Sequence, residues 1–204
     1  MQDRSGGSFY TDGSRGLHYD QQQYAMYFFH PAAQYSQTDV LSDTYVQRSV
    51  QFVNQHKGFD SNYYLHRIER NEQEQKVLVE FRNYMGNYAI YSEAQENDQN
   101  VIQLEVQNDR VVGYYRPMFE IDQVINQFPR ELPSGDQLLS SLEEEGILLS
   151  QVFSISLGYK LTIEEYYLNY VPHWVVELKN GERLFINKLK PKTEEEPSDE
   201  LESN

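Results

Sequence analysis

The chain has 204 residues, no cysteine and 39% hydrophobic residues, and its 17 Lys and Arg against 32 Asp and Glu give a net charge of −15. These values fit one large or two small globular domains, and they exclude thiolate catalysis, zinc–thiolate sites and iron–sulfur clusters. The negative charge disfavours binding to phosphate backbones and to anionic membrane surfaces, so no nucleic-acid partner is expected.

The two ends of the sequence carry no targeting signal. Residues 1–16 lack the apolar core of a signal peptide, and no stretch reaches the ~18 apolar residues of a membrane span. Two interpretations stay open on this basis: a cytosolic protein, or a piece of a longer protein whose membrane anchor lies outside these residues. Residues 191–204 hold six acidic residues and two prolines, which predicts a disordered acidic tail.

The first half predicts a hairpin, a helix and further strands. An aromatic strand over 24–29 pairs with 16–20 through a Gln-rich turn and ends at Pro31. The apolar spacing over Val40–Lys57 predicts an amphipathic helix, capped by Thr38 or Asp39 and stopped by Gly58. Strands are expected next at 63–69, 76–84 and 88–92.

The second half shows the same order of patterns. A hairpin is expected over 101–106 and 110–115 around Asn108-Asp109, followed by a short helix around 121–128. A second helix starts at the capping box Ser134 to Gln137, buries Leu138, Leu139 and Leu142, and ends at Gly146. The last expected strands are 147–159, 164–170, 174–178 and 183–189, with Asn180-Gly181 as a hairpin turn.

Two local matches indicate an internal repeat. Phe28-Phe-His-Pro31 matches Tyr114-Tyr-Arg-Pro117, and Tyr84 to Ile90 matches Tyr170 to Val176, both at an offset of 86 residues. We therefore predict an α+β fold of two similar antiparallel sheet units, each packed on one main helix, produced by duplication. The predicted units cover 8–94 and 99–190, with the acidic tail at 191–204. Chance recurrence of aromatic strands that end in proline is the competing explanation.

A search for catalytic or metal chemistry favours none. No two of the five histidines stand at metal-ligand spacing, and no phosphate-binding glycine motif or Gly-x-Ser-x-Gly elbow is present. The acidic runs Glu143–Glu145 and Glu164-Glu165 offer paired carboxylates, which a glycosidase needs in one cleft, but they fit solvated surfaces better. We expect no enzyme activity, no cofactor and no metal.

The unusual feature is the number of aromatic residues, 17 Tyr and 10 Phe. Most of them fit half-buried sheets, yet an exposed subset is expected among so many. Such a surface favours recognition over turnover, either of a protein partner or of a carbohydrate such as a wall polymer.

Six motifs, taken in chain order, resemble the C-terminal half of the YycH family. They are Tyr10-Thr-Asp-Gly-Ser-Arg15, Phe81-Arg82 with Gly86, Tyr115-Arg-Pro117, Leu132-Pro-Ser-Gly135, Leu157-Gly-Tyr159 and Pro172-His-Trp174. The resemblance implies that 8–94 and 99–190 correspond to the middle and C-terminal domains of that family. The related YycI family, thought to share the fold, is the second choice.

YycH proteins are accessory regulators of the WalK/WalR two-component system of Gram-positive bacteria. The resemblance thus implies a non-catalytic, extracytoplasmic region, anchored by one N-terminal membrane helix that these residues do not include. It also implies two partners, a YycI-like sister protein and a WalK-type sensor histidine kinase, and no cofactor.

Four residues are candidates for a partner interface: Tyr114, Arg116, His173 and Trp174. Arg116 stands before a proline at a strand end, where its guanidinium can stack on an aromatic ring or pair with an acid. A structural corner is the alternative for Arg116, and a place in the core is the alternative for Trp174.

Overall fold

The computed structural model describes residues 7–22, 24–30, 42–60, 62–93, 98–118, 126–164 and 167–189. The chain divides into two compact units. Unit 1 comprises Met1–Pro129 and Leu157–Pro172, and unit 2 comprises Arg130–Ser156 and His173–Asn204. Strands β9 (Val152–Ile163) and β10 (Leu168–Leu178) therefore contribute residues to both units.

Unit 1 is built around an antiparallel sheet with the strand order β1-β2-β3-β8-β7-β5-β4. The strands are β1 (Ser8–Thr11), β2 (Gly16–Asp20), β3 (Ala25–Phe29), β4 (Tyr63–Asn71), β5 (Lys76–Met85), β7 (Val101–Gln107) and β8 (Arg110–Pro117). Most neighbours in this sheet are hairpins closed by short turns. The turn at Asn108 and Asp109 has φ of 48° and 63°, a left-handed conformation that short polar side chains tolerate.

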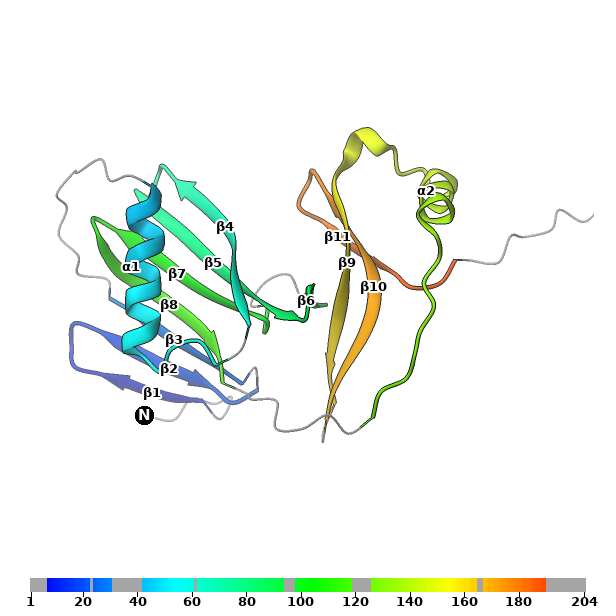
Figure 1. The fold of residues 1–204 in the computed structure, drawn as a ribbon. Helices are drawn as coiled ribbons and strands as arrows, with labels where there is room; N and C mark the ends of the chain where they lie inside the picture. Colours follow the sequence, from blue (N-terminus) through cyan, green and yellow to red (C-terminus); the bar gives the residue numbers. More distant parts are fainter. Residues whose placement is uncertain are drawn as a thin grey trace, which may run out of the picture. The chain divides into compact units, whose positions relative to one another are not determined.

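Helix α1 (Ser42–Gln55) covers one face of this sheet, as Figure 1 shows. Its apolar side packs on alternate residues of β5, β7 and β8, because successive strand side chains point to opposite faces. The buried members of this core are Val53, Val77, Val79, Phe81, Ile102, Leu104, Val106 and Tyr114. The helix ends at Gln55, and Gly58 follows with a φ of +73° and an N–H that donates to the carbonyl of Val53.

Strand β6 (Tyr88–Ser92) follows β5 through a turn at Gly86, where φ is +60°. It pairs with β9 in parallel, with Ala89 opposite Gly158 and Ser92 opposite Leu161. This parallel pairing makes the sheet mixed, since the neighbouring pairs β5–β6, β5–β7 and β10 with β11 (Arg183–Ile186) are antiparallel.

Unit 2 has its own core beneath helix α2 (Gly135–Glu144). A capping box at Ser134 and Gln137 starts the helix, as the sequence predicts, and Gly146 follows its end with φ of +77°. Leu138 and Leu142 pack with Val176 of β10, together with half-buried residues of β9 and β11 (Arg183–Ile186). A 3-10 turn, η1 (Leu149–Gln151), precedes β9.

The α+β class is confirmed, with a mixed sheet and few helices, but the duplication is not. The two segments of the first match lie on strands that pair with each other: Phe28 of β3 lies opposite Tyr114 of β8. In the second pair, Tyr84 to Ile90 forms the β5–β6 hairpin, whereas Tyr170 to Val176 lies within β10. The ranges 8–94 and 99–190 remain a prediction; the observed sheet of unit 1 draws strands from both.

Some expected elements differ in detail. Strands predicted separately at 164–170 and 174–178 form parts of one strand, β10, and the strand expected from 147 begins at Val152. The caps at Thr38 and Asp39 and most of the helix expected around 121–128 lie outside the described residues. Within the described part of the chain, no helix has both the length and the apolar character needed to cross a bilayer.

Candidate functional site

A buried cluster of charged side chains lies on β5 and the segment that follows β6, on the sheet face opposite α1. We call it the Arg82 cluster; it comprises Glu80, Arg82 and Asp98. Arg82 Nη1 donates to Asp98 Oδ2 at 2.6 Å, and Arg82 Nη2 donates to Glu80 Oε1 at 3.0 Å. Residues 80 and 82 share a face because side chains alternate along a strand.

The remaining carboxylate oxygens of the cluster also accept hydrogen bonds. Glu80 Oε2 accepts from Arg67 and Gln103, while Asp98 Oδ1 accepts from the backbone N–H of Ser92 and of Asn100. Burial by itself would lower the pKa of Arg82, but the Asp98 and Glu80 carboxylates outweigh it, and the net effect is a raised pKa. Both acids are thus engaged in holding a permanent cation.

Arg82 also connects β5 to β6. Its Nη1 donates to the carbonyl of Ile90 at 3.0 Å, and its guanidinium lies 4.4 Å from the centroid of the Tyr91 ring. This arrangement suits a structural connection rather than proton transfer. In the sequence, Arg82 is marked only by the family resemblance. A second signal is present there: Glu80 and Arg82 are opposite charges two residues apart within an apolar strand.

The predicted residues Tyr114 and Arg116 come together on the α1 side of the sheet, the face opposite the Arg82 cluster. Both side chains are buried, and Arg116 Nη1 donates to the Tyr114 hydroxyl at 3.3 Å. The same guanidinium donates to the carbonyl of His56 and to Asp60, just beyond α1. Burial raises the pKa of Tyr114, partly opposed by Arg116. Arg116 therefore connects β8 to the segment that follows α1.

The predicted residues His173 and Trp174 are neighbours on β10. His173 is buried with its ring 5.8 Å from that of Phe185, in an edge-on arrangement. Trp174 is half-buried in the core of unit 2, and its Nε1 donates to the carbonyl of Pro133 at 2.8 Å. As partner contacts, the four predicted residues remain a prediction.

The turn between β1 and β2 is organised by Asp12. Its carboxylate accepts from the backbone N–H of Ser14 and Arg15 and from both of their side chains. The backbone bonds are the main cause of a pKa well below the usual aspartate range.

We expect the Asp12 carboxylate to stay ionised in acid that protonates it in the unfolded chain. Because the folded pKa is depressed, its contribution to stability is present above the unfolded pKa and is lost as pH falls through the folded value. Carboxyl-detected NMR titration of native and urea-unfolded protein measures both values. Equal values in the two states would contradict the prediction.

The described residues of the acidic runs, Glu143–Glu145 and Glu164, are exposed. Because Glu143 and Glu164 are both exposed, the hypothesis of hydrolysis by this pair is rejected. Among the described residues, no group of three or more His, Asp or Glu side chains is arranged to hold a metal ion.

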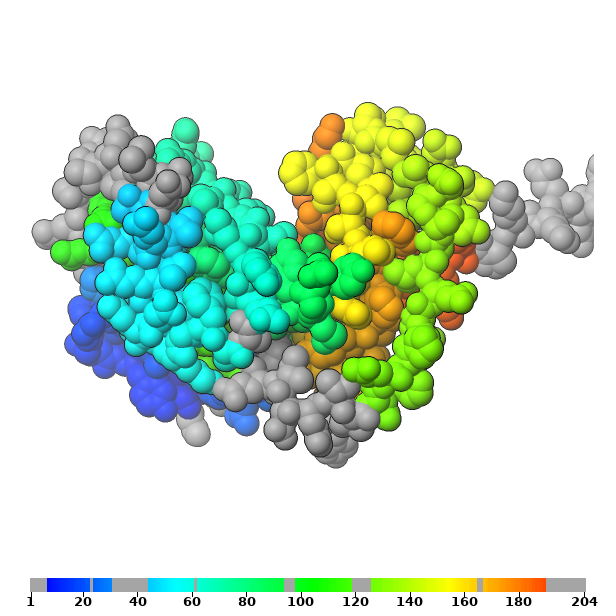
Figure 2. Space-filling view, in the orientation of Figure 1, coloured from blue at the N-terminus to red at the C-terminus, as the bar shows by residue number. Residues whose placement is uncertain are grey.

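The exposed aromatic subset that the composition predicts is present in the described residues. The exposed tyrosines are Tyr10, Tyr24, Tyr64, Tyr88 and Tyr167. Strand β4 combines Tyr64, which is 56% exposed, with the exposed apolar residues Leu65 and Ile68. Side chains of α1 and of the β4 region occupy the face of unit 1 in view in Figure 2. These side chains, rather than the buried clusters, are accessible to a partner.

The fold and these clusters define a class: an α+β domain whose ion clusters hold strands together and whose exposed side chains are available for recognition. The chain belongs to the family described as YycH protein, C-terminal domain, which matches residues 1–188.

Two solved structures are similar to the chain. The crystal structure of YycH from Bacillus subtilis has a TM-score of 0.67 and 18% identity, covering 92% of this chain and 46% of that one. An uncharacterized protein from Eubacterium rectale has a TM-score of 0.52 and 10% identity, covering 93% of this chain and 70% of that one. The chain thus spans less than half the length of the Bacillus protein. No curated protein matches.

Proposed function

We propose that this chain is a non-catalytic regulatory region of a YycH-type accessory protein, which modulates a WalK-type sensor histidine kinase together with a YycI-like sister protein. Membership of the YycH C-terminal domain family over residues 1–188 carries the proposal. In the cell, the region lies outside the cytoplasmic membrane, held there by an anchor in another part of the protein.

The placement of the motif residues supports a binding role for the rest of the surface. Arg82, Arg116 and Trp174 each donate hydrogen bonds to other parts of the fold, so they help to fix its shape. The exposed side chains are available to contact a partner protein. Aromatic side chains supply much of the binding energy at such interfaces. We propose that Tyr114, Arg116, His173 and Trp174 act on an interface by positioning the strands that carry it.

Calorimetric titration of the chain with the soluble ectodomain of a YycI-like protein from the same organism tests this function. We expect micromolar or tighter binding. Replacement of an exposed tyrosine at a binding hot spot by Ala should weaken the affinity for the partner about 30-fold. Absence of heat and of co-elution would contradict the interface proposed for this region.

The alternative is a wall-polymer or carbohydrate-binding module, which the five exposed tyrosines favour. Titration with wall fragments, followed by Tyr and Trp174 fluorescence, separates the two functions. Saturable quenching would support the alternative, and a flat response up to millimolar fragments would remove it.

A further inference from the structure

Strand β4 forms an edge of the unit 1 sheet. Among the described residues it pairs with β5 alone, so from Arg67 to Asn71 its outer side is available to a further strand. An edge of this kind is a template for adding another strand, unless charge, proline or a bulge blocks it.

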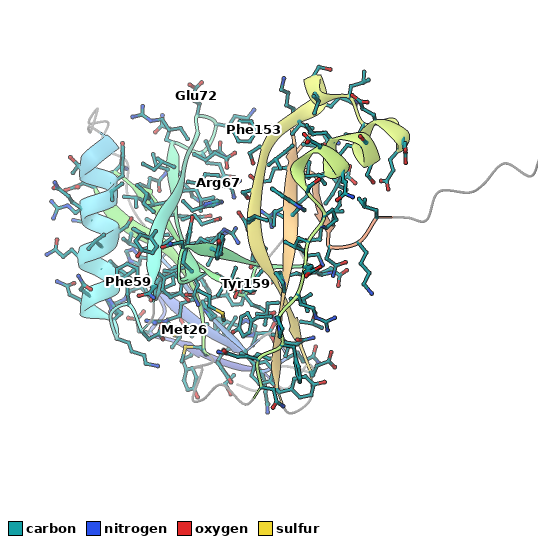
Figure 3. The ribbon with its side chains drawn as sticks, turned by 45° about the vertical axis from the view of Figure 1, so that its right-hand side comes forward. Met26, Phe59, Arg67, Glu72, Phe153 and Tyr159 are labelled. Carbon is teal, nitrogen blue, oxygen red and sulfur yellow. The ribbon has the colours of Figure 1, made fainter. Side chains whose placement is uncertain are left out.

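The two halves of β4 differ in this respect. The register with β5 shifts between Leu65 and Arg67, a bulge that distorts the first half of the edge. From Arg67 to Asn71 the pairing is regular, residue by residue, against Lys76 to Glu80. This second half contains no proline and is open to a partner strand. Figure 3 labels Arg67 on β4 and Glu72 just beyond the strand.

The sequence of this half is complementary to itself. When two antiparallel copies meet with Ile68 on the two-fold axis, Arg67 of each copy faces Glu69 of the other. An axis at Arg67 or at Glu69 would instead place like charges opposite each other, which is destabilising. Of these three axes, the charges therefore favour the one at Ile68.

The side chains in that register are accessible. Arg67 is 52% and Glu69 is 61% exposed, and they already form an ion pair of 3.5 Å within one chain. Ile68 is 39% exposed and lies opposite Val79, a residue of the α1 core. Pairing about Ile68 would cover this apolar side chain with its copy and extend the core side of the sheet.

We propose that β4 is a self-association edge, through which two copies of this chain form an antiparallel sheet across a two-fold axis at Ile68. The contact is isologous and short, so the dimer is weak and depends on concentration. Self-association through β4 is independent of the regulatory function proposed above.

The chain has no cysteine, so an introduced cysteine is the only thiol that can form a disulfide in a cross-linking test. Directly opposite side chains are within reach of a disulfide, whereas diagonal neighbours are about 7–8 Å apart. We expect oxidised Ile68→Cys to form a covalent dimer much faster than Glu69→Cys or Glu72→Cys. A mixture of Arg67→Cys and Glu69→Cys should form the mixed dimer. Equal rates for all the variants would overturn the proposal.

Sedimentation velocity over a range of concentrations provides the second test. Glu69→Arg places Arg opposite Arg67 and should abolish dimer formation, while Glu143→Arg on α2 makes the same change in net charge and should leave it intact. A chain that stays monomeric at all concentrations, or a dimer unaffected by Glu69→Arg, would overturn the proposal. Circular dichroism of each variant verifies that it is folded.

Discussion

Replacement of Arg82 by Met should lower the free energy of unfolding by about 3–5 kcal/mol, since it leaves two buried carboxylates without their cation. Glu80 and Asp98 accept from the guanidinium at 3.0 and 2.6 Å, and all three side chains are almost fully buried. The connection to β6 through the Ile90 carbonyl is lost as well. Urea unfolding followed by far-UV circular dichroism measures the effect.

Arg67→Met is the matched control. It removes another arginine that donates to the same Glu80, but Arg67 is half exposed and its contribution should be within about 1 kcal/mol. The triple change Arg82→Met, Glu80→Gln, Asp98→Asn should recover part of the loss, because no buried charge is then unpaired. Equal effects of Arg82→Met and Arg67→Met would contradict the structural function of the cluster.

Local sequence signals predicted the local structure well. The Asn108-Asp109 turn, the capping box at Ser134 and the left-handed ends at Gly58 and Gly146 all formed where expected. Each depends on residues only a few positions apart, whose backbone preferences are strong enough to act without the rest of the fold.

Long-range pairing was not predictable in this way. The 86-residue offset suggested two equivalent units, yet the two aromatic strands resemble each other because they are neighbours, with Phe28 opposite Tyr114. Side chains on adjacent strands share one core and so are chosen by similar packing demands. The parallel pairing of β6 with β9 has no local signal at all, since its residues are about 70 positions apart.

The candidate site was missed for the same reason. Arg82 was visible as a motif residue, but its partner Asp98 lies 16 residues further along, beyond β6. Nothing in the spacing indicates that the two side chains meet. The same holds for Arg116, whose acceptors, the His56 carbonyl and Asp60, lie about 60 residues earlier in the chain, just after α1.

Replacement of Leu142 by Ala should destabilise unit 2 by about 2–5 kcal/mol, since the change opens a cavity under α2. Leu142 is fully buried and packs in one cluster with Leu138, Val176 and Trp174. Because Trp174 is the single tryptophan of the chain, its fluorescence reports the unfolding of this core directly. Leu139→Ala, on the same helix but half-buried, should have a clearly smaller effect. If both variants unfold at the same urea concentration, α2 is not held by the face that the structure assigns to it.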